Sequence, residues 1–345
     1  MVTKNLNYIT HLRVFACFSI ILAHTVCTPV IYYSNDYSNF TIYLSVIISE
    51  ICRGGVYIFI LISGALFLQP AKELSFRKLF NKYIFRIVCS LVIFGTIFAL
   101  MEIVFNEHSF KLKQVIKSFS FMIQNKSWGH LWYLYMLVGL YLVTPILKRF
   151  VNTAEKSEII YFLAILLLFN MIFPFVEAYT GIKIGFSIPF VGVNLFYYIL
   201  GYAIDSRVVR IPNKLSFFLI IFSIVIYFIE FFFNVKINIQ AVCFESFSNS
   251  LIFKSFIPIA LFSLTLNFLD KMKVSDFEKL LSDLSFGVYI FHAVFINFIY
   301  KVLKLSPAII NVFIIWLAVF VVTSISSFIL TYLFRCIPFV KKHVL

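Results

Sequence analysis

Residues Arg13 to His24 read RVFACFSIILAH, an apolar run that begins with a guanidinium and ends with an imidazole. The surrounding apolar stretch is long enough to cross a membrane as a helix. An Arg near the bilayer centre costs at least ~2.5 kcal/mol, so the charge needs an explanation. The spacing of Arg13 and His24 corresponds to three helical turns plus roughly 20°. The two side chains therefore share one helix face, roughly 16 Å apart along the axis, and indicate a polar passage.

An alternative for Arg13 is a side chain that snorkels to the membrane surface. That alternative leaves His24 unexplained, because His24 lies deeper in the run and on the same face. A titratable side chain within a membrane is a functional hypothesis by default.

The composition of the whole chain excludes an ordinary water-soluble protein. The chain is 62% hydrophobic and 13% charged, whereas soluble domains carry about 25% charged residues. Apolar runs of spanning length recur from end to end, and no long polar stretch separates them. We therefore expect one all-α polytopic membrane domain over residues 1–345. The net charge of +14 does not indicate nucleic-acid binding, because the basic residues lie in short loops between apolar runs.

The hydropathy pattern predicts about ten transmembrane helices around a polar passage. Their expected ranges are 8–30, 42–68, 80–105, 130–149, 158–177, 184–204, 214–234, 246–269, 281–303 and 308–334.

The distribution of basic residues predicts the orientation. If both termini are cytoplasmic, the inner segments hold 18 Lys and Arg and the outer loops hold 8. The positive-inside rule favours that arrangement. The outer loop at 107–129 alternates basic and apolar residues, which suits either a helix lying in the membrane interface or a loop covering the bundle.

The six cysteines show no CxxC pair and no paired spacing. Most of them lie inside apolar runs, where Cys usually acts as a small hydrophobic residue. We therefore expect neither a disulfide framework nor a metal site.

Five stretches, in order, resemble the membrane-bound acyltransferase-3 family, and most closely its branch that O-acetylates enterobacterial surface polysaccharide. The opening Arg and His resemble the signature of the family's first helix. The resemblance covers nearly the whole chain, and its stretches are NLNYITHLRVFACFSIILAH (5–24), VYIFILISGALFL (56–68), HLWYLYMLVGLYLVTPIL (130–147), NLFYYILGYAI (194–204) and LSFGVYIFHAVFI (284–296).

The resemblance implies an O-acetyltransferase of the bacterial cytoplasmic membrane. Such an enzyme moves an acetyl or other short acyl group from cytosolic acetyl-coenzyme A to a hydroxyl of an envelope polysaccharide or its lipid-linked precursor. Its expected partners are acyl-CoA, the glycan acceptor and membrane lipid, with no nucleic acid and no permanently bound cofactor. A homo-oligomer is compatible with the sequence.

The chemistry of that reaction suits His24 and Arg13. A neutral imidazole can take the hydroxyl proton as a base or hold the acyl group as a nucleophile, and the sequence leaves both roles open for His24. Arg13 is expected to meet the phosphates of the donor through bidentate hydrogen bonds.

The segment FRKLFNKYIFR (76–86) is the second candidate for donor binding, through Lys82 and Arg86. Relatives often have an Arg-x-x-Arg pair here, and in this chain Tyr83 stands at its first position. Positive-inside topology alone also explains the cluster.

Further site candidates are Arg53, Glu102, Tyr289, His292 and Trp132. Arg53 suits either acceptor binding or an interfacial anchor, and His292 suits either the site or a buried structural contact. Glu102, like Lys254, lies in an apolar span and needs a partner. Trp132 suits either a sugar contact or the aromatic belt of the membrane interface.

Two other functions remain open from the sequence. Intramembrane charges and broken helices also describe a transporter of a glycan or small anion, although no paired halves are visible in the chain. A non-catalytic partner of a polysaccharide synthase is the third alternative.

Overall fold

The computed structural model describes residues 6–108, 110–187, 192–232, 256–305 and 311–345. Its regular structure over these residues is helical, in agreement with the predicted class of helical membrane protein. The longest apolar helical segments have bounds close to those predicted, and they are Asn7–Tyr32, Asn39–Phe67, Phe76–Glu107, Gly129–Thr153, Lys156–Glu177, Asp276–Val302 and Val312–Arg335.

The number of helices that could span a membrane differs from the prediction of ten. In the described ranges, seven helices are long and apolar enough to cross by themselves. The other three predicted spans contain α9 (Val193–Asp205), α10 (Asn213–Phe232) and α13 (Phe256–Phe268), as far as the structure describes them. The bounds of α10 agree with the predicted 214–234 within two residues, and α9 is shorter than the predicted 184–204. Hydropathy marks the α9 segment as apolar but does not fix the length of helix that forms there. Crossing of the membrane by these three stays a prediction.

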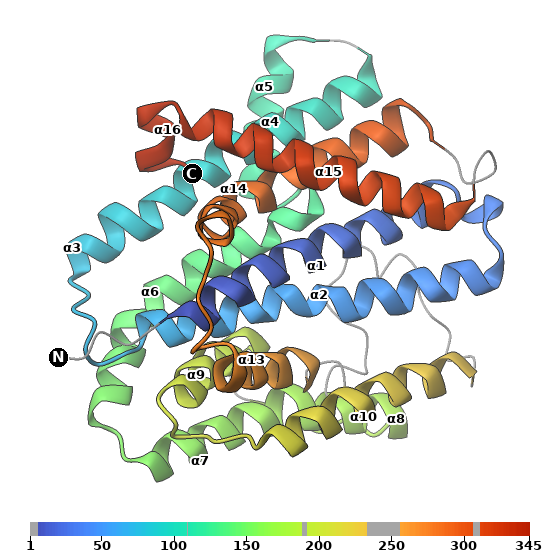
Figure 1. The fold of residues 1–345 in the computed structure, drawn as a ribbon. Coiled ribbons are helices and arrows are strands. Elements are labelled where there is room, and N and C mark those ends of the chain that lie inside the picture. The colour runs from blue at the N-terminus through green and yellow to red at the C-terminus, as the bar shows by residue number, and fades with distance from the viewer. Residues whose placement is uncertain (1–5, 109, 188–191, 233–255, 306–310) are drawn as a thin grey trace.

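Two long helices, α1 (Asn7–Tyr32) and α2 (Asn39–Phe67), form the centre of the bundle. They run antiparallel and pack closely along their length. On one side lie α14 (Asp276–Asn297) and α15 (Val312–Arg335), and on the other lie α9, α10 and α13 (Figure 1). The beginning of α1 and the ends of α2 and α15 lie at the same end of the bundle (Figure 1).

Glycines allow α2 and α9 to cross almost backbone to backbone. A Cβ at Gly64 would lie 1.7 Å from the carbonyl oxygen of Tyr198, and a Cβ at Gly201 would lie 2.0 Å from that of Leu61. Any larger side chain would therefore force the helices apart. The Ser-Gly and Gly-Tyr pairs of the sequence are thus packing residues at a helix crossing.

A network of buried polar groups ties four helices together at the end where α1 begins. The Tyr8 hydroxyl donates to Asp205 at 2.6 Å, and the Gln69 amide donates to the same carboxylate. The Lys148 ammonium on α6 (Trp132–Thr153) lies 3.4 Å from the Phe67 carbonyl, at the end of α2. These bonds satisfy polar groups at helix ends and fix the relative positions of α1, α2, α6 and α9.

The segment predicted as an interfacial helix or a covering loop contains a helix, α5 (Leu112–Ile123). The helix packs against α4 (Phe85–Glu107), and a Cβ at Gly95 would lie 2.7 Å from the Met122 side chain. Its exposed side chains include Leu112, Ile116 and Ile123. Such an apolar exposed face suits a helix lying in the membrane interface.

One expectation about the cysteines is wrong. Cys27, near the end of α1, is disulfide-bonded, whereas Cys17, Cys52, Cys89 and Cys336 are free. The spacing rules for small secreted domains do not detect this bond, because a fold can bring together cysteines that are far apart in the chain.

Candidate active site

Three histidines from three separate parts of the chain meet in the interior of the bundle. His24 lies on α1, His292 on α14, and His130 on the short η3 turn (Gly129–Leu131) that precedes α6. The ring centroid of His292 lies 5.1 Å from that of His24 and 5.1 Å from that of His130. His130 and His292 are buried, and His24 is half-buried.

Hydrogen bonds to carbonyl oxygens fix the protons on two of these rings. Nδ1 of His292 lies 2.6 Å from the Tyr289 carbonyl oxygen, and Nε2 of His130 lies 3.2 Å from the Ile290 carbonyl oxygen. A carbonyl can only accept, so each of these nitrogens carries a proton. The neutral rings therefore present Nε2 of His292 and Nδ1 of His130 as acceptors.

The His24 ring is held differently. It contacts the ring of His292, and the described residues give it no hydrogen bond. Neither of its nitrogens is therefore committed to a hydrogen bond within this part of the chain. Within the described ranges, no group of three His, Cys, Asp or Glu side chains is arranged to hold a metal ion. An imidazole with available nitrogens can accept or donate a proton near neutral pH.

A cavity of about 410 Å³ lies between α1, α2, α4, α6, α14 and α15, beside the histidines. Four cationic side chains and a single carboxylate, that of Asp283, line it. The cations are Arg13, Lys72, Arg86 and Arg335. A partly buried cavity with this excess of positive charge suits an anionic ligand.

Two tyrosines lie between this cavity and the histidines. Tyr133 and Tyr289 both line the cavity, and their ring centroids lie 5.1 Å apart. The Tyr289 ring also lies 5.8 Å from His130 and 5.8 Å from His292. Its hydroxyl donates to the His130 carbonyl oxygen, which holds the start of α6 against α14. Cavity and histidines therefore share one wall.

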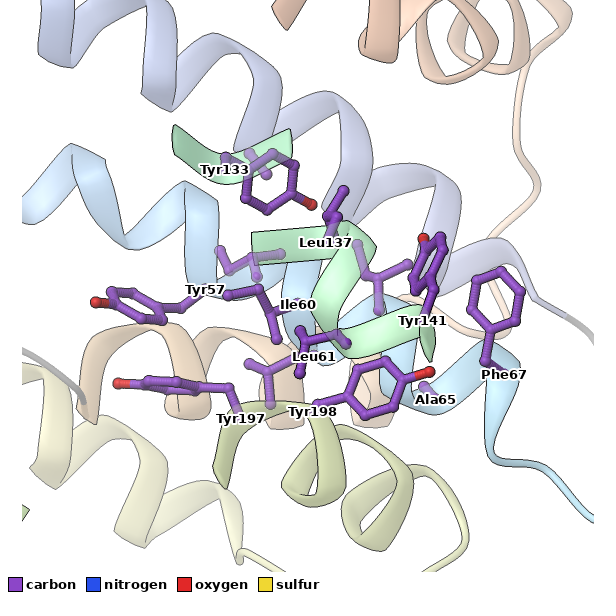
Figure 2. Close-up of a cluster of buried hydrophobic side chains, with 14 of the residues drawn as sticks. Tyr57, Ile60, Leu61, Ala65, Phe67, Tyr133, Leu137, Tyr141, Tyr197 and Tyr198 are labelled. Carbon is purple, nitrogen blue, oxygen red and sulfur yellow. The ribbon is translucent and has the colours of Figure 1, made fainter. Parts of the chain in front are cut away.

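Aromatic side chains form much of the remaining wall. Phe67 contacts Tyr83 edge-on at 4.8 Å and Tyr141 at 4.7 Å between ring centroids. Figure 2 shows Tyr141 beside Phe67 at one end of this cluster and Tyr57 facing Tyr197 at the other. Apolar walls of this kind suit a ligand with an extended, weakly polar arm attached to its anionic part.

The structure places the predicted donor-binding residues as follows. Arg13 and Arg86 line the cavity, and the Arg86 guanidinium also donates to the main-chain oxygen of Leu345. Lys82 is exposed and lies outside the cavity lining, whereas its neighbour Tyr83 lies within it. Both residues belong to a π-helical turn, η2 (Leu79–Ile84), a distortion that often occurs at functional sites.

The other predicted site residues lie at several places. Arg53 is half-buried beside Glu50 on the same helix, with Nη1 and Oε1 3.6 Å apart. Glu102 pairs at 2.6 Å with Lys301. Trp132 contacts the Tyr133 ring edge-on at 6.3 Å and does not line the cavity. Lys254 lies outside the described residues.

Four residues around the site were not predicted as site residues. His130 lies in the HLW stretch. A titratable side chain within an apolar segment indicates a functional site, so the sequence could have identified it. Glu50 carried the same signal as Glu102. Lys72 and Arg335 lie at the borders of apolar runs, where positive-inside topology already explains a cation, and no pattern distinguished them.

Comparison with known proteins identifies the class. A family model described as an acyltransferase domain matches residues 6–334, which is nearly the whole chain. The chain therefore belongs to the acyltransferase-3 family, a family of membrane acyltransferases. No curated protein and no solved structure matches the chain in the same comparisons.

Proposed function

We propose that this protein is an O-acyltransferase that moves an acetyl or other short acyl group from cytosolic acyl-CoA to a hydroxyl of an envelope polysaccharide or its lipid-linked precursor. The observation that carries the proposal is the shared wall between the cationic cavity and the three histidines. A donor with phosphates at one end and a thioester at the other requires such an arrangement.

The donor side follows from the charges of the cavity. Arg13, Arg86 and Arg335 face the cavity from α1, α4 and the end of α15. Guanidinium groups bind phosphate oxygens through paired, charge-assisted hydrogen bonds. With the phosphates at these cations, the pantetheine arm would run along the aromatic wall towards Tyr133 and Tyr289. The thioester carbonyl would then lie next to the histidines.

The transfer step needs a group that accepts the proton of the attacking hydroxyl. In the direct route, His24 takes that proton while the hydroxyl oxygen bonds to the thioester carbonyl carbon. The carbon–sulfur bond then breaks and the coenzyme A thiolate leaves, while His24 still holds the proton. In the covalent route, a His24 nitrogen bonds to the thioester carbonyl carbon and the carbon–sulfur bond breaks, which releases the coenzyme A thiolate. The acceptor hydroxyl then takes the acyl group from His24, and its proton passes to the freed imidazole and on to the thiolate. Accumulation of acylated His24 without acceptor would distinguish the covalent route from the direct one.

The neighbouring histidines are suited to positioning His24. The Nδ1–H of His292 donates a hydrogen bond to the Tyr289 carbonyl oxygen. In the neutral ring, Nε2 therefore carries no proton and can accept a hydrogen bond. This nitrogen is buried and has no hydrogen-bond partner among the described residues. A donor N–H from His24 would satisfy it and leave the other His24 nitrogen free as a base. We therefore assign His292 as a positioning residue, with His130 packed behind it.

The acceptor is proposed to enter from the opposite side of the membrane. The disulfide of Cys27, three residues beyond His24, supports an oxidising compartment on that side, such as the periplasm. The excess of basic residues in the opposite loops supports the same orientation. Arg53, which interacts electrostatically with His24, is a candidate contact for the acceptor. The location that follows is the bacterial cytoplasmic membrane, with both termini inside.

Mass spectrometry of envelope glycans from cells with and without the protein tests the proposed function. We expect glycan masses to differ by whole acyl groups. Identical glycans in both samples, at verified expression, would contradict it.

A further inference from the structure

Lys72 occupies an unusual position at the rim of the cationic cavity. It lies in the loop after α2, and its Nζ is 4.2 Å from the Phe67 ring centroid and 5.6 Å from that of Tyr83. Both rings line the cavity together with Lys72. Contacts between an ammonium group and aromatic faces restrict a side chain that is otherwise flexible. The rings therefore hold this charge at the cavity instead of leaving it in solvent.

Several positive charges lie near Lys72. No ion pair joins Lys72 to a carboxylate in the part of the chain that the structure describes. Burial, followed by nearby positive charges, lowers the pKa of the Lys72 ammonium to about 8, and these charges belong to Lys78, Lys148, Arg13 and Lys82. Cations placed close together without counter-charges favour the binding of an anion.

We propose that Lys72 binds a phosphate group of the acyl-CoA donor, with Phe67 and Tyr83 holding its ammonium towards the cavity. The proposal rests on the proposed function, because it takes the donor to be a coenzyme A thioester. Tyr83 carries no charge on the η2 turn, and Lys72 supplies a cation next to it. Lys72 is thus a donor-binding residue that reaches the cavity from a loop, in addition to the guanidinium groups on the helices.

Affinity for the donor should then depend on pH. A phosphate monoester is fully ionised above pH ~7, since its second pKa is ~6. The charged groups around Lys72 are Arg13 on α1, Lys78 on α3 (Phe76–Lys78), Lys82 on η2 and Lys148 on α6, with Arg86, Arg335 and Asp283 elsewhere in the cavity lining. Lys72 is charged below its pKa of about 8 and neutral above it, so affinity should fall as pH rises through about 8.

Equilibrium binding of coenzyme A to the purified full-length protein tests the proposal. We expect Lys72→Gln to weaken binding roughly tenfold or more, the usual range for a lost hydrogen bond to a charged group. Lys72→Arg should retain most of the affinity and abolish the fall above pH 8. Lys271→Gln removes an equal charge from an exposed side chain that lies outside the cavity lining and is not among the charges around Lys72, so it is the matched control and should bind like wild type.

The outcomes separate this inference from the proposed function. Wild-type affinity in Lys72→Gln, or a pH dependence that persists in Lys72→Arg, would overturn the role of Lys72. A wild-type protein that does not bind coenzyme A at all would instead overturn the proposed donor. If Lys72→Gln does not fold, the role of Lys72 is still tested by comparing the pH dependence of coenzyme A affinity in wild type and in Lys72→Arg. Repeating the measurement with 3′-dephospho-coenzyme A identifies which phosphate Lys72 binds. If Lys72→Gln weakens the binding of coenzyme A alone, Lys72 binds the 3′-phosphate. If it weakens the binding of both ligands equally, Lys72 binds the diphosphate.

Discussion

The imidazole rings of His24 and His292 lie 5.1 Å apart between centroids, although their helices come from opposite ends of the chain. This contact depends on the packing of α1 against α14. His292 is held by its own hydrogen bond to Tyr289, and among the described residues His24 has no such bond. The pair therefore consists of a fixed ring and a ring that is free to meet a substrate.

The role of His292 can be tested by His292→Asn, which keeps a donor for the Tyr289 carbonyl and removes Nε2. We expect kcat to fall about 10- to 100-fold, with the donor KM unchanged, because positioning is lost and donor binding is not. The control is His108→Asn at an exposed residue with φ of 48°, a conformation that Asn tolerates. A wild-type kcat in His292→Asn would show that the contact is only structural.

Arg13→Lys keeps the charge at the cavity and loses the bidentate geometry of the guanidinium. We expect the donor KM to rise several-fold or more while the acceptor KM stays unchanged. Steady-state kinetics with each substrate varied in turn measure this. Arg77→Lys, at an exposed residue outside the cavity, should change neither constant. An unchanged donor KM in Arg13→Lys would favour a snorkelling side chain instead.

Gly64→Ala tests the helix crossing. The added Cβ would lie 1.7 Å from the Tyr198 carbonyl oxygen, so α2 and α9 must separate. We expect destabilisation of at least the 1–3 kcal/mol typical of overpacking, seen as a lower Tm in detergent. A Cβ at Gly139 on α6 would meet nothing within 4 Å, so Gly139→Ala should leave Tm equal or slightly higher. Equal Tm values for both variants would contradict the close crossing.

The orientation can be tested by labelling single added cysteines with a reagent that does not cross the membrane. The segment that joins α1 to α2 and the segment that joins α13 to α14 lie at opposite ends of the bundle (Figure 1). They contain the exposed residues Asn35 and Lys273, respectively. We expect reagent applied outside intact cells to modify Asn35→Cys and to leave Lys273→Cys unmodified until the cells are opened. The reverse pattern would place both termini outside and the cationic cavity on the wrong side for a cytosolic donor.

Much of the fold could be predicted because hydropathy acts locally. The helices of α1, α2 and α15 were expected within a few residues of their bounds. The bounds of α10 also agree with the predicted 214–234 within two residues. The helix α9 is shorter than the predicted 184–204, because a helix end depends on capping and on neighbouring helices as well as on apolar composition. The close approach of α2 and α9 at Gly64 and Tyr198 could not be predicted either, because the sequence alone does not show which helices pack together.

The candidate site was predictable to a similar extent. The common face of Arg13 and His24 follows from helix geometry, and the structure places Arg13 in the cavity and His24 against His292. His130 was missed because its position next to His292 arises from tertiary packing of the η3 turn. Lys72 was missed for a different reason, namely that cations at the ends of apolar runs are common in any membrane protein.

The most direct test of the proposed catalysis is the rate of acyl transfer by His24→Gln, measured with purified protein and saturating acetyl-CoA. Binding of coenzyme A to the same preparation shows whether the donor site is intact. We expect wild-type affinity for coenzyme A together with a transfer rate at least ~10²-fold below wild type, the effect typical of losing an acid–base group. A variant that binds coenzyme A and still transfers acyl groups at a rate near wild type would contradict the assignment of His24 as the catalytic residue.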